Sequence, residues 1–217
     1  GSEMCIRDRT MTKHNNDLNT RLRASPCQHE WDVSPKQAVQ IQHSLREHLC
    51  MHDDLDTVNR IAGLDIGFEQ NGKITRAAVA VLDPGSLALM ETAVARVPTT
   101  FPYVPGLLSF RELPGALEAL KLLSELPDLI LCDGQGYAHP RRMGIACHLG
   151  LLTNIPTLGV GKSRLVGQHD MPGHRKGDRA VLIHKGEVVG CVLRTRDNVS
   201  PVSVSYTHLT LPTISSV

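Results

Sequence analysis

Apolar residues recur in the first half of the chain with helical spacing in one segment and strand-like spacing in three others. Ser34 and Pro35 supply cap and first-turn chemistry, and apolar residues follow on one stripe at positions 38, 41, 45 and 49. This pattern predicts a surface helix over residues 36–49. Residues 61–68, 77–82 and 87–97 have the pattern of strands, joined by an Asn-Gly pair at 71–72 and a Pro-Gly pair at 84–85. Links this short predict an antiparallel meander.

The second half alternates between the two spacings. Residues 107–126 have helical periodicity, although Pro114 could break the helix. Residues 128–132 form a mostly apolar run that fits a buried parallel strand. A helix over about 141–152, a strand at 157–160 and a hairpin of 180–184 with 188–194 follow. Three antiparallel strands followed by alternating helix and strand predict an α/β fold with a mixed sheet flanked by helices.

The two ends of the chain differ from the body. Residues 1–22 are polar and unpatterned, with a second possible start at Met11, and the composition changes abruptly again after Ser205. Both ends resemble translated adapter sequence. We therefore expect a disordered or non-native leader at 1–28, one domain at 29–205, and a non-native tail at 206–217 that cuts the natural protein short.

Composition narrows the class of protein. The 217 residues, 41% of them hydrophobic, suffice for one domain with a sizeable core. The 23 Lys and Arg residues balance 22 Asp and Glu residues, which excludes a strongly basic nucleic-acid coat protein. Six cysteines without zinc-type spacing, and no secretory leader, predict reduced thiols in the cytoplasm. No apolar run reaches the roughly 20 residues of a membrane span.

Two acidic residues stand in or directly after apolar strands. Asp65 lies in IAGLDIGF, where its apolar neighbours predict burial, and an ionised carboxylate there is costly unless a cation or donors compensate it. Asp133 follows DLILC at the carboxyl end of a predicted strand, where sites gather in open α/β sheets. The alternatives are a strand-end cap for Asp65 and a plain Asp-Gly turn for Asp133.

A third carboxylate completes a candidate metal site. Glu112 lies in SFRELPG near the start of a predicted helix, where a solvated first-turn glutamate is the ordinary alternative. Mg²⁺ prefers a few carboxylate oxygens together with water and phosphate, and two such ions can support phosphodiester cleavage. The three acids together therefore suggest metal-dependent phosphodiester chemistry.

Two further segments have the composition of a nucleic-acid site. PTTFPYVPG holds Tyr103 between prolines, which would present its ring for stacking on or wedging between bases, unless the ring packs across its own loop. DGQGYAHPRR combines flexible glycines with His139, Arg141 and Arg142 at a predicted helix start, a setting that suits phosphate. The alternatives are a buried histidine and solvated arginines. Lys162 in LGVGKSRL is a candidate phosphate lysine, but this segment does not complete a P-loop.

Five motifs in order resemble the endonuclease V family over roughly residues 29–205: HEWDVSP, GLDIGFE, the PYVPG-to-FRE segment, DGQGYAHPRRMGIACHLGLL and PTLGVGKSRL. The resemblance implies a ribonuclease H-like fold and a DNA-repair endonuclease that recognises deoxyinosine. It implies hydrolysis of the second phosphodiester bond on the 3′ side of the lesion, with Mg²⁺, or Mn²⁺ as a substitute. The implied partner is inosine-containing DNA or RNA. We also expect the protein to be a monomer that does not bind a membrane.

The resemblance also assigns roles to residues. Asp65, Glu112 and Asp133 resemble the metal-binding acids, and His139 and Lys162 resemble groups at the scissile phosphate. The implied strand-separating wedge is Pro102, Tyr103, Val104 and Pro105. The implied walls of the hypoxanthine pocket are Gly106, Leu108, Gly134, Gly136, Gly144 and Leu165. Basic residues at Arg141, Arg142 and Arg164 would carry further phosphate contacts.

The chain departs from the family pattern at two places. Gln135 stands where the family usually has a histidine, so the group there cannot titrate near neutrality. The family also continues after Ser205 into a motif whose histidine helps to complete the metal site, and the neighbours of His208 do not match that motif. A damage-binding module without catalysis is therefore the alternative function. A sugar or acetate kinase relative is a third, which the absence of a second phosphate loop disfavours.

Overall fold

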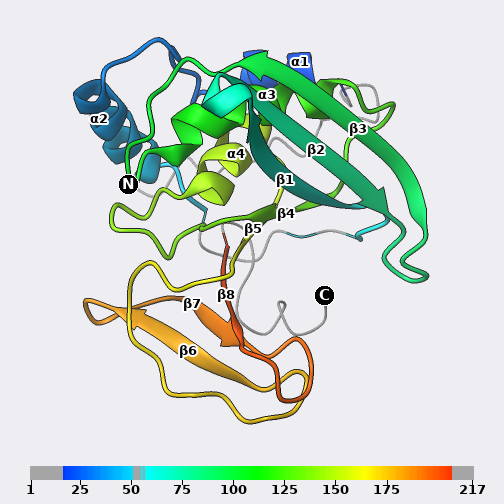
Figure 1. Ribbon diagram of the computed structural model, residues 1–217, viewed down its shortest axis with the longest axis vertical. Coiled ribbons are helices and arrows are strands. Elements are labelled where there is room, and N and C mark those ends of the chain that lie inside the picture. The colour runs from blue at the N-terminus through cyan, green and yellow to red at the C-terminus, as the bar shows by residue number, and fades with distance from the viewer. Residues whose placement is uncertain (1–16, 51–54, 56, 207–217) are drawn as a thin grey trace.

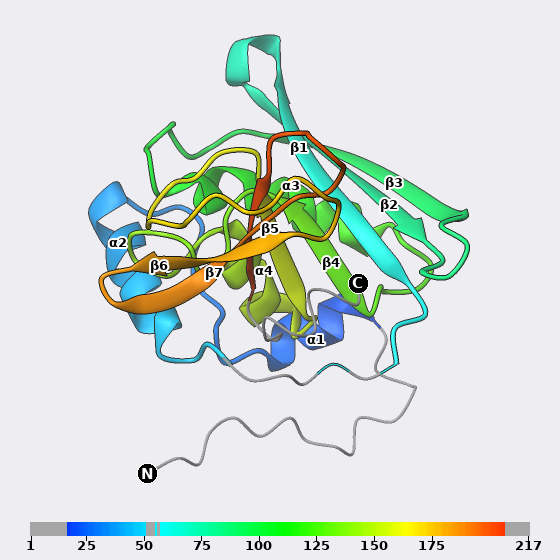
Figure 2. The same ribbon diagram turned by 90° about the horizontal axis from the view of Figure 1, so that it is seen from below.

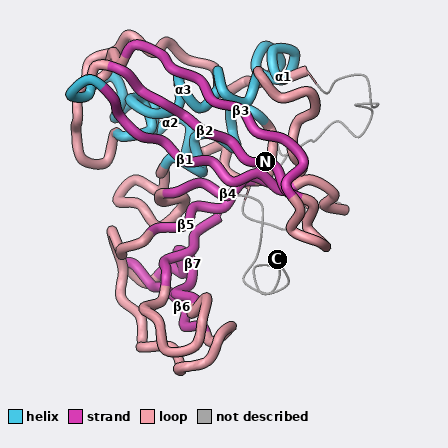
Figure 3. Tube along the Cα trace, turned by 45° about the vertical axis from the view of Figure 1, so that its right-hand side comes forward, coloured by secondary structure: helices cyan, strands magenta, loops and turns pink. Residues whose placement is uncertain are grey.

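The computed structural model describes residues 17–50, 55 and 57–206, which form one mixed eight-stranded sheet with helices on one face. The strand order is β3-β2-β1-β4-β5-β8-β7-β6, a continuous band in Figure 3. The strands, in chain order, are β1 Ile61–Glu69, β2 Ile74–Leu82, β3 Leu89–Pro98, β4 Leu129–Asp133, β5 Thr157–Gly161, β6 Arg179–His184, β7 Glu187–Leu193 and β8 Val202–Tyr206. The α-helices are α1 Leu18–Ala24, α2 Pro35–Arg46, α3 Leu108–Lys121 and α4 Ile145–Thr153 (Figure 1).

The predicted meander and the parallel strands are confirmed. Strands β1, β2 and β3 pair antiparallel, while β4 pairs parallel with both β1 and β5. The Asn-Gly signal forms the short 3₁₀ turn Gln70–Gly72, in which Asn71 has a φ of 56°. Asparagine tolerates this left-handed conformation better than most residues do, which is why the sequence marks the turn.

The core on the helical side of the sheet holds α3 against β1–β3 and α4 against β4 and β5. Alternate residues of β2, from Ala77 to Val81, point into this core, as the period of a strand requires. Helix α3 runs through Pro114, so the predicted helix is present and the possible break at this proline does not occur. The helix buries Leu113, Ala116 and Leu120 completely, and this apolar burial offsets the hydrogen bond that proline cannot donate.

The helix predicted over about 141–152 begins later than the sequence pattern indicates. Helix α4 starts at Ile145, with Gly144 as its N-cap, so Arg141 and Arg142 lie in the preceding loop and not at a helix start. Arg142 has a φ of 60°, which a right-handed helix cannot contain. The periodicity of the apolar residues continued into the loop because Met143 is itself completely buried there.

Two elements lie outside the predictions. Strand β8 inserts between β5 and β7 and pairs antiparallel with both. Its alternation of valine and serine does not separate an apolar face from a polar one, since Val204, Ser203 and Ser205 are all buried. The second element is α1, which is capped by Asp17 and lies within the leader predicted over 1–28. Leu18 and Cys27 are buried, so residues 17–28 are part of the folded domain. Residues 1–16 and 207–217, with His208, lie outside the described residues.

The hairpin of β6 and β7 extends the sheet beyond β8 and returns toward the helices. Figure 2 shows it on the same side of the molecule as α2, away from the meander of β1–β3, and side chains of the hairpin and of α2 belong to one small apolar cluster that includes Leu45, Leu182 and Val189. The cluster also contains Tyr137 and Met143 from the loop between β4 and α4. The hairpin therefore packs against this loop through apolar side chains. No helix among the described residues is long and apolar enough to cross a membrane.

Candidate active site

Two of the predicted metal-binding acids lie on neighbouring parallel strands. Leu64 of β1 pairs with Cys132 of β4, and Asp65 and Asp133 are the next residues along each strand. Both carboxylates therefore emerge at the same level of the sheet. The prediction that Asp65 is buried is wrong, because Asp65 is exposed while Leu64 points into the core. The alternation of β1 explains this, since Asp65 faces the side of the sheet opposite to α3 and α4.

Glu112 is the carboxylate that the fold removes from water. It lies on the second turn of α3, and its pKa rises from 4.5 to about 7. Burial is the main cause, the charge of Asp133 comes next, and the charge of Asp65 adds to it, while Arg111 acts in the opposite direction. The three predicted acids are therefore electrostatically coupled, and the alternative of a solvated first-turn glutamate does not apply to Glu112.

Lys162 supplies a positive charge beside Asp133. Its Nζ donates to Oδ2 of Asp133 at 2.5 Å, although the lysine side chain is 82% exposed. This hydrogen bond raises the pKa of Lys162, and the charges of Asp133 and Asp65 act in the same direction. Such an exposed pair is weak and easily exchanged for another cation.

The chemistry of the three acids fits a hard divalent cation. Among the described residues no three acidic, histidine or cysteine side chains converge closely enough to form a finished set of metal ligands. The charge balance nevertheless favours a cation, because burial and the charges of two further carboxylates raise the pKa of Glu112, and the charge of Arg111 opposes this rise only in part. Oxygen donors of this kind suit Mg²⁺ or Mn²⁺, and a bound ion would return the pKa of Glu112 toward its usual range.

His139 lies in the loop between β4 and α4 and is only 3% exposed. Burial lowers its pKa to about 4, and the positive charges of Arg141 and Arg142 contribute to the decrease. Its Nδ1 accepts a hydrogen bond from the backbone N–H of Arg141 at 3.2 Å. His139 is therefore neutral at physiological pH and can act as a hydrogen-bonding group, but not as a fixed positive charge.

The four predicted phosphate cations fall into two classes. Lys162 and Arg164 are exposed on the loop that follows β5. Arg142, in contrast, is 4% exposed, and its guanidinium group binds Glu187 at 2.9 Å and His184. These internal contacts leave Arg142 no surface to offer a phosphate, so the structure gives it a structural role instead. The guanidinium of Arg141 is likewise engaged, with Gly106 and Gln42.

The predicted wedge protrudes from the protein. Tyr103 is 68% exposed, and the prolines on both sides of it are also exposed. Phe101 and Leu107 are buried at the two ends of the loop and attach it to the core that also contains α2. The alternative in which the ring packs across its own loop is therefore not what the structure shows.

The predicted pocket residues lie in loops that approach one another closely. Gly144 packs against the carbonyl group of Gln135 so tightly that a Cβ atom would overlap it. A Cβ atom on Gly136 would lie 2.8 Å from the carbonyl oxygen of Ser205. These two glycines permit the close packing of the loop after β4. Leu165 is 51% exposed, and Leu108 and Gly134 are partly exposed.

Gln135, at the position where the family usually has histidine, connects two loops of the site. Its Nε2 donates to the carbonyl oxygen of Ser163 at 2.8 Å, and its Oε1 is buried without a partner. The amide therefore joins the loop after β4 to the loop after β5, which carries Lys162.

The sequence motifs are matched by known proteins. The sequence profile of the family described as Endonuclease V matches residues 43–215. Endonuclease V of Trichormus variabilis is 52% identical over 187 residues, which cover 85% of each chain. Endonuclease V of Azotobacter vinelandii is 49% identical over 179 residues, covering 82% of this chain and 81% of the relative.

This chain belongs to the endonuclease V family.

Solved structures of the family share the fold. Endonuclease V of Streptomyces avermitilis has a TM-score of 0.78 at 40% identity, and the matched region covers 82% of this chain and 79% of the Streptomyces chain. Endonuclease V of Ciona intestinalis, in complex with a 24mer DNA containing an inosine followed by a ribo-adenosine, has a TM-score of 0.71 at 25% identity, with coverages of 83% and 86%. The predicted ribonuclease H-like mixed sheet and the assignment as a nuclease are thereby confirmed.

The structure also shows residues of this endonuclease V site that sequence reasoning missed. Gln42 of α2 and Glu187 of β7 each hold the loop after β4 through several hydrogen bonds. The one available signal was that Gln42 interrupts the apolar stripe of its helix. Glu187 follows a Lys-Gly turn and has no signal of its own.

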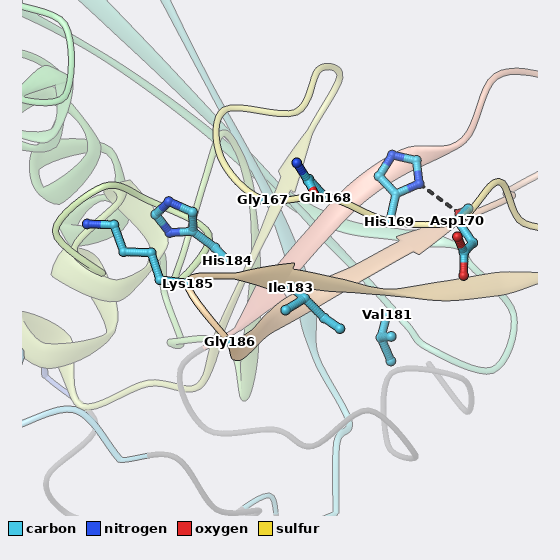
Figure 4. Close-up of a pocket in the computed structure, with 9 residues that line it drawn as sticks. All are labelled: Gly167, Gln168, His169, Asp170, Val181, Ile183, His184, Lys185 and Gly186. Carbon is cyan, nitrogen blue, oxygen red and sulfur yellow. Dashed lines mark hydrogen bonds between the residues drawn. The ribbon is translucent and has the colours of Figure 1, made fainter.

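A separate hollow opens on the hairpin and contains none of the predicted residues. Figure 4 shows its lining, which comes from the segment 167–170 and from β6 with its turn. His169 closes one side, where its Nδ1 contacts the carbonyl oxygen of Asp170 at 2.8 Å. The hollow is open and has no concentration of acidic groups, so the carboxylate site remains the candidate active site.

Proposed function

We propose that this endonuclease V is a metal-dependent repair enzyme that recognises deoxyinosine in DNA and hydrolyses the second phosphodiester bond on its 3′ side. The observation that supports this most strongly is the β1–β4 register, which sets Asp65 and Asp133 at the same level of neighbouring strands, together with the effect of both charges on the pKa of Glu112. The complex of the Ciona intestinalis relative with inosine-containing DNA supports the substrate class. We expect the enzyme to act as a monomer in the cytoplasm.

The metal would be held by Asp65, Glu112 and Asp133, with Mg²⁺ as the expected ion and Mn²⁺ as a substitute. When bound, such an ion activates water and stabilises the charge that develops on the leaving oxygen. The protein itself provides the desolvated carboxylate of Glu112, whose charge is costly until a cation compensates it. Lys162 and Arg164 are exposed beside this site and would bind the phosphates of the substrate strand.

Base recognition would involve the wedge and the pocket. The exposed ring of Tyr103 would fill the gap that a flipped base leaves in the stack, a step that costs least when the base is mispaired. The flipped base would then enter the space bounded by Gly106, Leu108 and the loop after β4. His139, which is neutral, would contribute a hydrogen bond near the scissile phosphate and no positive charge.

The test is the cleavage of a duplex that carries one deoxyinosine. We expect Mg²⁺-dependent nicking at the second 3′ phosphodiester bond, mapped on a sequencing gel. Asp133→Asn should lose more than about 100-fold of this rate and keep most of its binding. Asp32→Asn, which changes an exposed aspartate outside the site, is the matched control and should cut like the wild type.

The outcomes separate the alternatives. Equal nicking of undamaged duplex would contradict deoxyinosine recognition. Selective binding without nicking would identify a damage-binding module in place of a nuclease. A parallel assay with inosine-containing RNA determines which nucleic acid is preferred.

A further inference from the structure

The side chain of Gln42 connects the two loops of the proposed substrate site. Gln42 lies on α2, is 1% exposed, and interrupts a stripe of apolar residues that includes Ala38 and Leu45. Its Nε2 donates to the carbonyl oxygen of Gly106 at 3.0 Å and to that of Met143 at 3.1 Å. Gly106 ends the wedge loop, and Met143 belongs to the loop after β4. One buried amide thus holds both loops at a fixed separation.

Arg141 completes this connection. Its Nε donates to Oε1 of Gln42 at 2.5 Å, and its Nη2 donates to the carbonyl oxygen of Gly106 at 2.7 Å. Arginine can only donate and the two carbonyl groups can only accept, so the orientation of the Gln42 amide is determined. The carbonyl group of Gly106 therefore receives two donors, and both N–H groups of the Gln42 amide are used.

Gln42 differs in polarity from the other residues that its helix buries. The buried residues of α2 are Ala38, Gln42 and Leu45, so Gln42 is the only polar side chain that this helix buries. Burying an amide is costly unless its hydrogen bonds are made, so a glutamine here gains from specific partners and not from packing. The partners in this case are the backbone of the two proposed substrate loops.

The contact with Gly106 affects the wedge because Gly106 lies close to Tyr103 in the chain. Gly106 has a φ of 79°, and it follows Tyr103 by three residues in a loop whose prolines limit its freedom. Fixing the carbonyl group of Gly106 therefore fixes the direction in which the Tyr103 ring leaves the protein. Gly106 also lies beside His139, because a Cβ atom on Gly106 would be 3.5 Å from Nε2 of His139.

We propose that Gln42 is a positioning residue that sets the wedge loop relative to the loop after β4, and so determines the preference for inosine-containing duplex. This inference rests on the proposed function. Gln42 acts through Gly106 and Arg141 and does not itself contact the substrate. Arg141 is accordingly part of the same connection, in addition to any contact it makes with phosphate.

The experiment measures binding, so that it does not depend on turnover. The chain would be titrated by fluorescence anisotropy with an inosine-containing duplex, a matched undamaged duplex and an inosine-containing single strand, with Ca²⁺ in place of Mg²⁺. Gln42→Met keeps the length of the side chain and removes its hydrogen bonds. We expect affinity for the inosine duplex to fall about tenfold, and affinity for undamaged duplex to change by less than about twofold. Gln40→Met, on the exposed side of the same helix, should have no effect.

A double-mutant cycle with Tyr103→Ala separates positioning from general stability. If Gln42 acts through the wedge, removing the tyrosine from Gln42→Met should cost much less than removing it from the wild type. Losses that multiply independently would overturn the proposal. Gln42→Glu keeps an acceptor for Arg141 but loses the donors to both carbonyl groups, and it serves if Gln42→Met does not fold. Wild-type selectivity in Gln42→Glu would also overturn the proposal.

The wild-type titration distinguishes the two levels of failure. If the wild type does not prefer the inosine duplex, the proposed function fails and the positioning role fails with it. If the wild type has the preference and Gln42→Met retains it, the positioning role alone is wrong.

Discussion

Two partly buried glutamates in this protein have opposite electrostatic environments. Glu112 faces two other carboxylates and has a pKa raised to about 7. Burial also acts to raise the pKa of Glu187, but hydrogen bonds from Tyr137 and Arg142 outweigh it and hold the pKa below its usual value. The fold therefore supplies a hydrogen-bonded counter-charge for Glu187, whereas the charge of Arg111 compensates that of Glu112 only in part. The first is a structural ion pair, and the second is a place for a cation that the protein does not itself provide.

The largest expected difference between Glu112 and Glu187 is in their effect on catalysis. Glu112→Gln should reduce Mg²⁺-dependent nicking of the deoxyinosine duplex by more than about 100-fold, because it removes a charged oxygen donor from the proposed metal site. Initial rates under single-turnover conditions measure this loss. Near wild-type turnover in Glu112→Gln would show that the raised pKa does not mark a metal ligand.

The pH dependence of stability should reveal the incompletely compensated charge of Glu112. In the folded state Glu112 keeps its proton up to about pH 7, whereas the unfolded chain loses it near 4.5. The folded protein therefore binds more protons between these values, and its free energy of unfolding should fall as pH rises through this window. Each unit of pKa difference corresponds to about 1.4 kcal/mol, so the full difference corresponds to about 3.5 kcal/mol, and solvent screening of the partly exposed group reduces this to about 2–3 kcal/mol.

Urea unfolding of the wild type and Glu112→Gln, in EDTA at pH 5 and pH 8, measures this effect. At pH 8 the free energy of unfolding of the variant should rise relative to that of the wild type. Excess Mg²⁺ should reduce this difference, because it binds to the folded wild type. His139 has the opposite effect, because its lowered pKa makes the free energy of unfolding fall as pH decreases below about 6.5. Comparing the two proteins at each pH cancels this contribution, which both share. A constant difference across the range would contradict the assigned cause.

The paired glutamate should respond through stability alone. Glu187→Gln leaves the 5% exposed guanidinium of Arg142 without its carboxylate and should cost about 1–3 kcal/mol of unfolding free energy at pH 7.5. Glu118→Gln breaks the exposed pair with Lys121 and should change stability by less than about 0.5 kcal/mol. Equal effects of the two substitutions in urea unfolding would show that Arg142 does not depend on Glu187.

The sequence predicted the elements with strong periodicity and the acids that follow them. The strands of the meander, β4 and β5 were found because an apolar run or an alternation has a local signature. Arg141 and Arg142 were misplaced at a helix start because a left-handed residue has no signature beyond its own backbone angle. Strand β8 was missed because it is buried on both faces, so its serines do not mark a solvent side.

By itself, the sequence determined which residues can form strands, which carboxylates stand in or after them, and that an aromatic ring lies between prolines. These properties follow from neighbours within a few positions along the chain. Only the tertiary structure decided that Glu112 is desolvated and Asp65 exposed, that Lys162 pairs with Asp133, and that Gln42 joins two loops. Charge compensation and buried hydrogen bonds depend on which distant segments meet, and that information becomes available only when the sheet and its helices have packed.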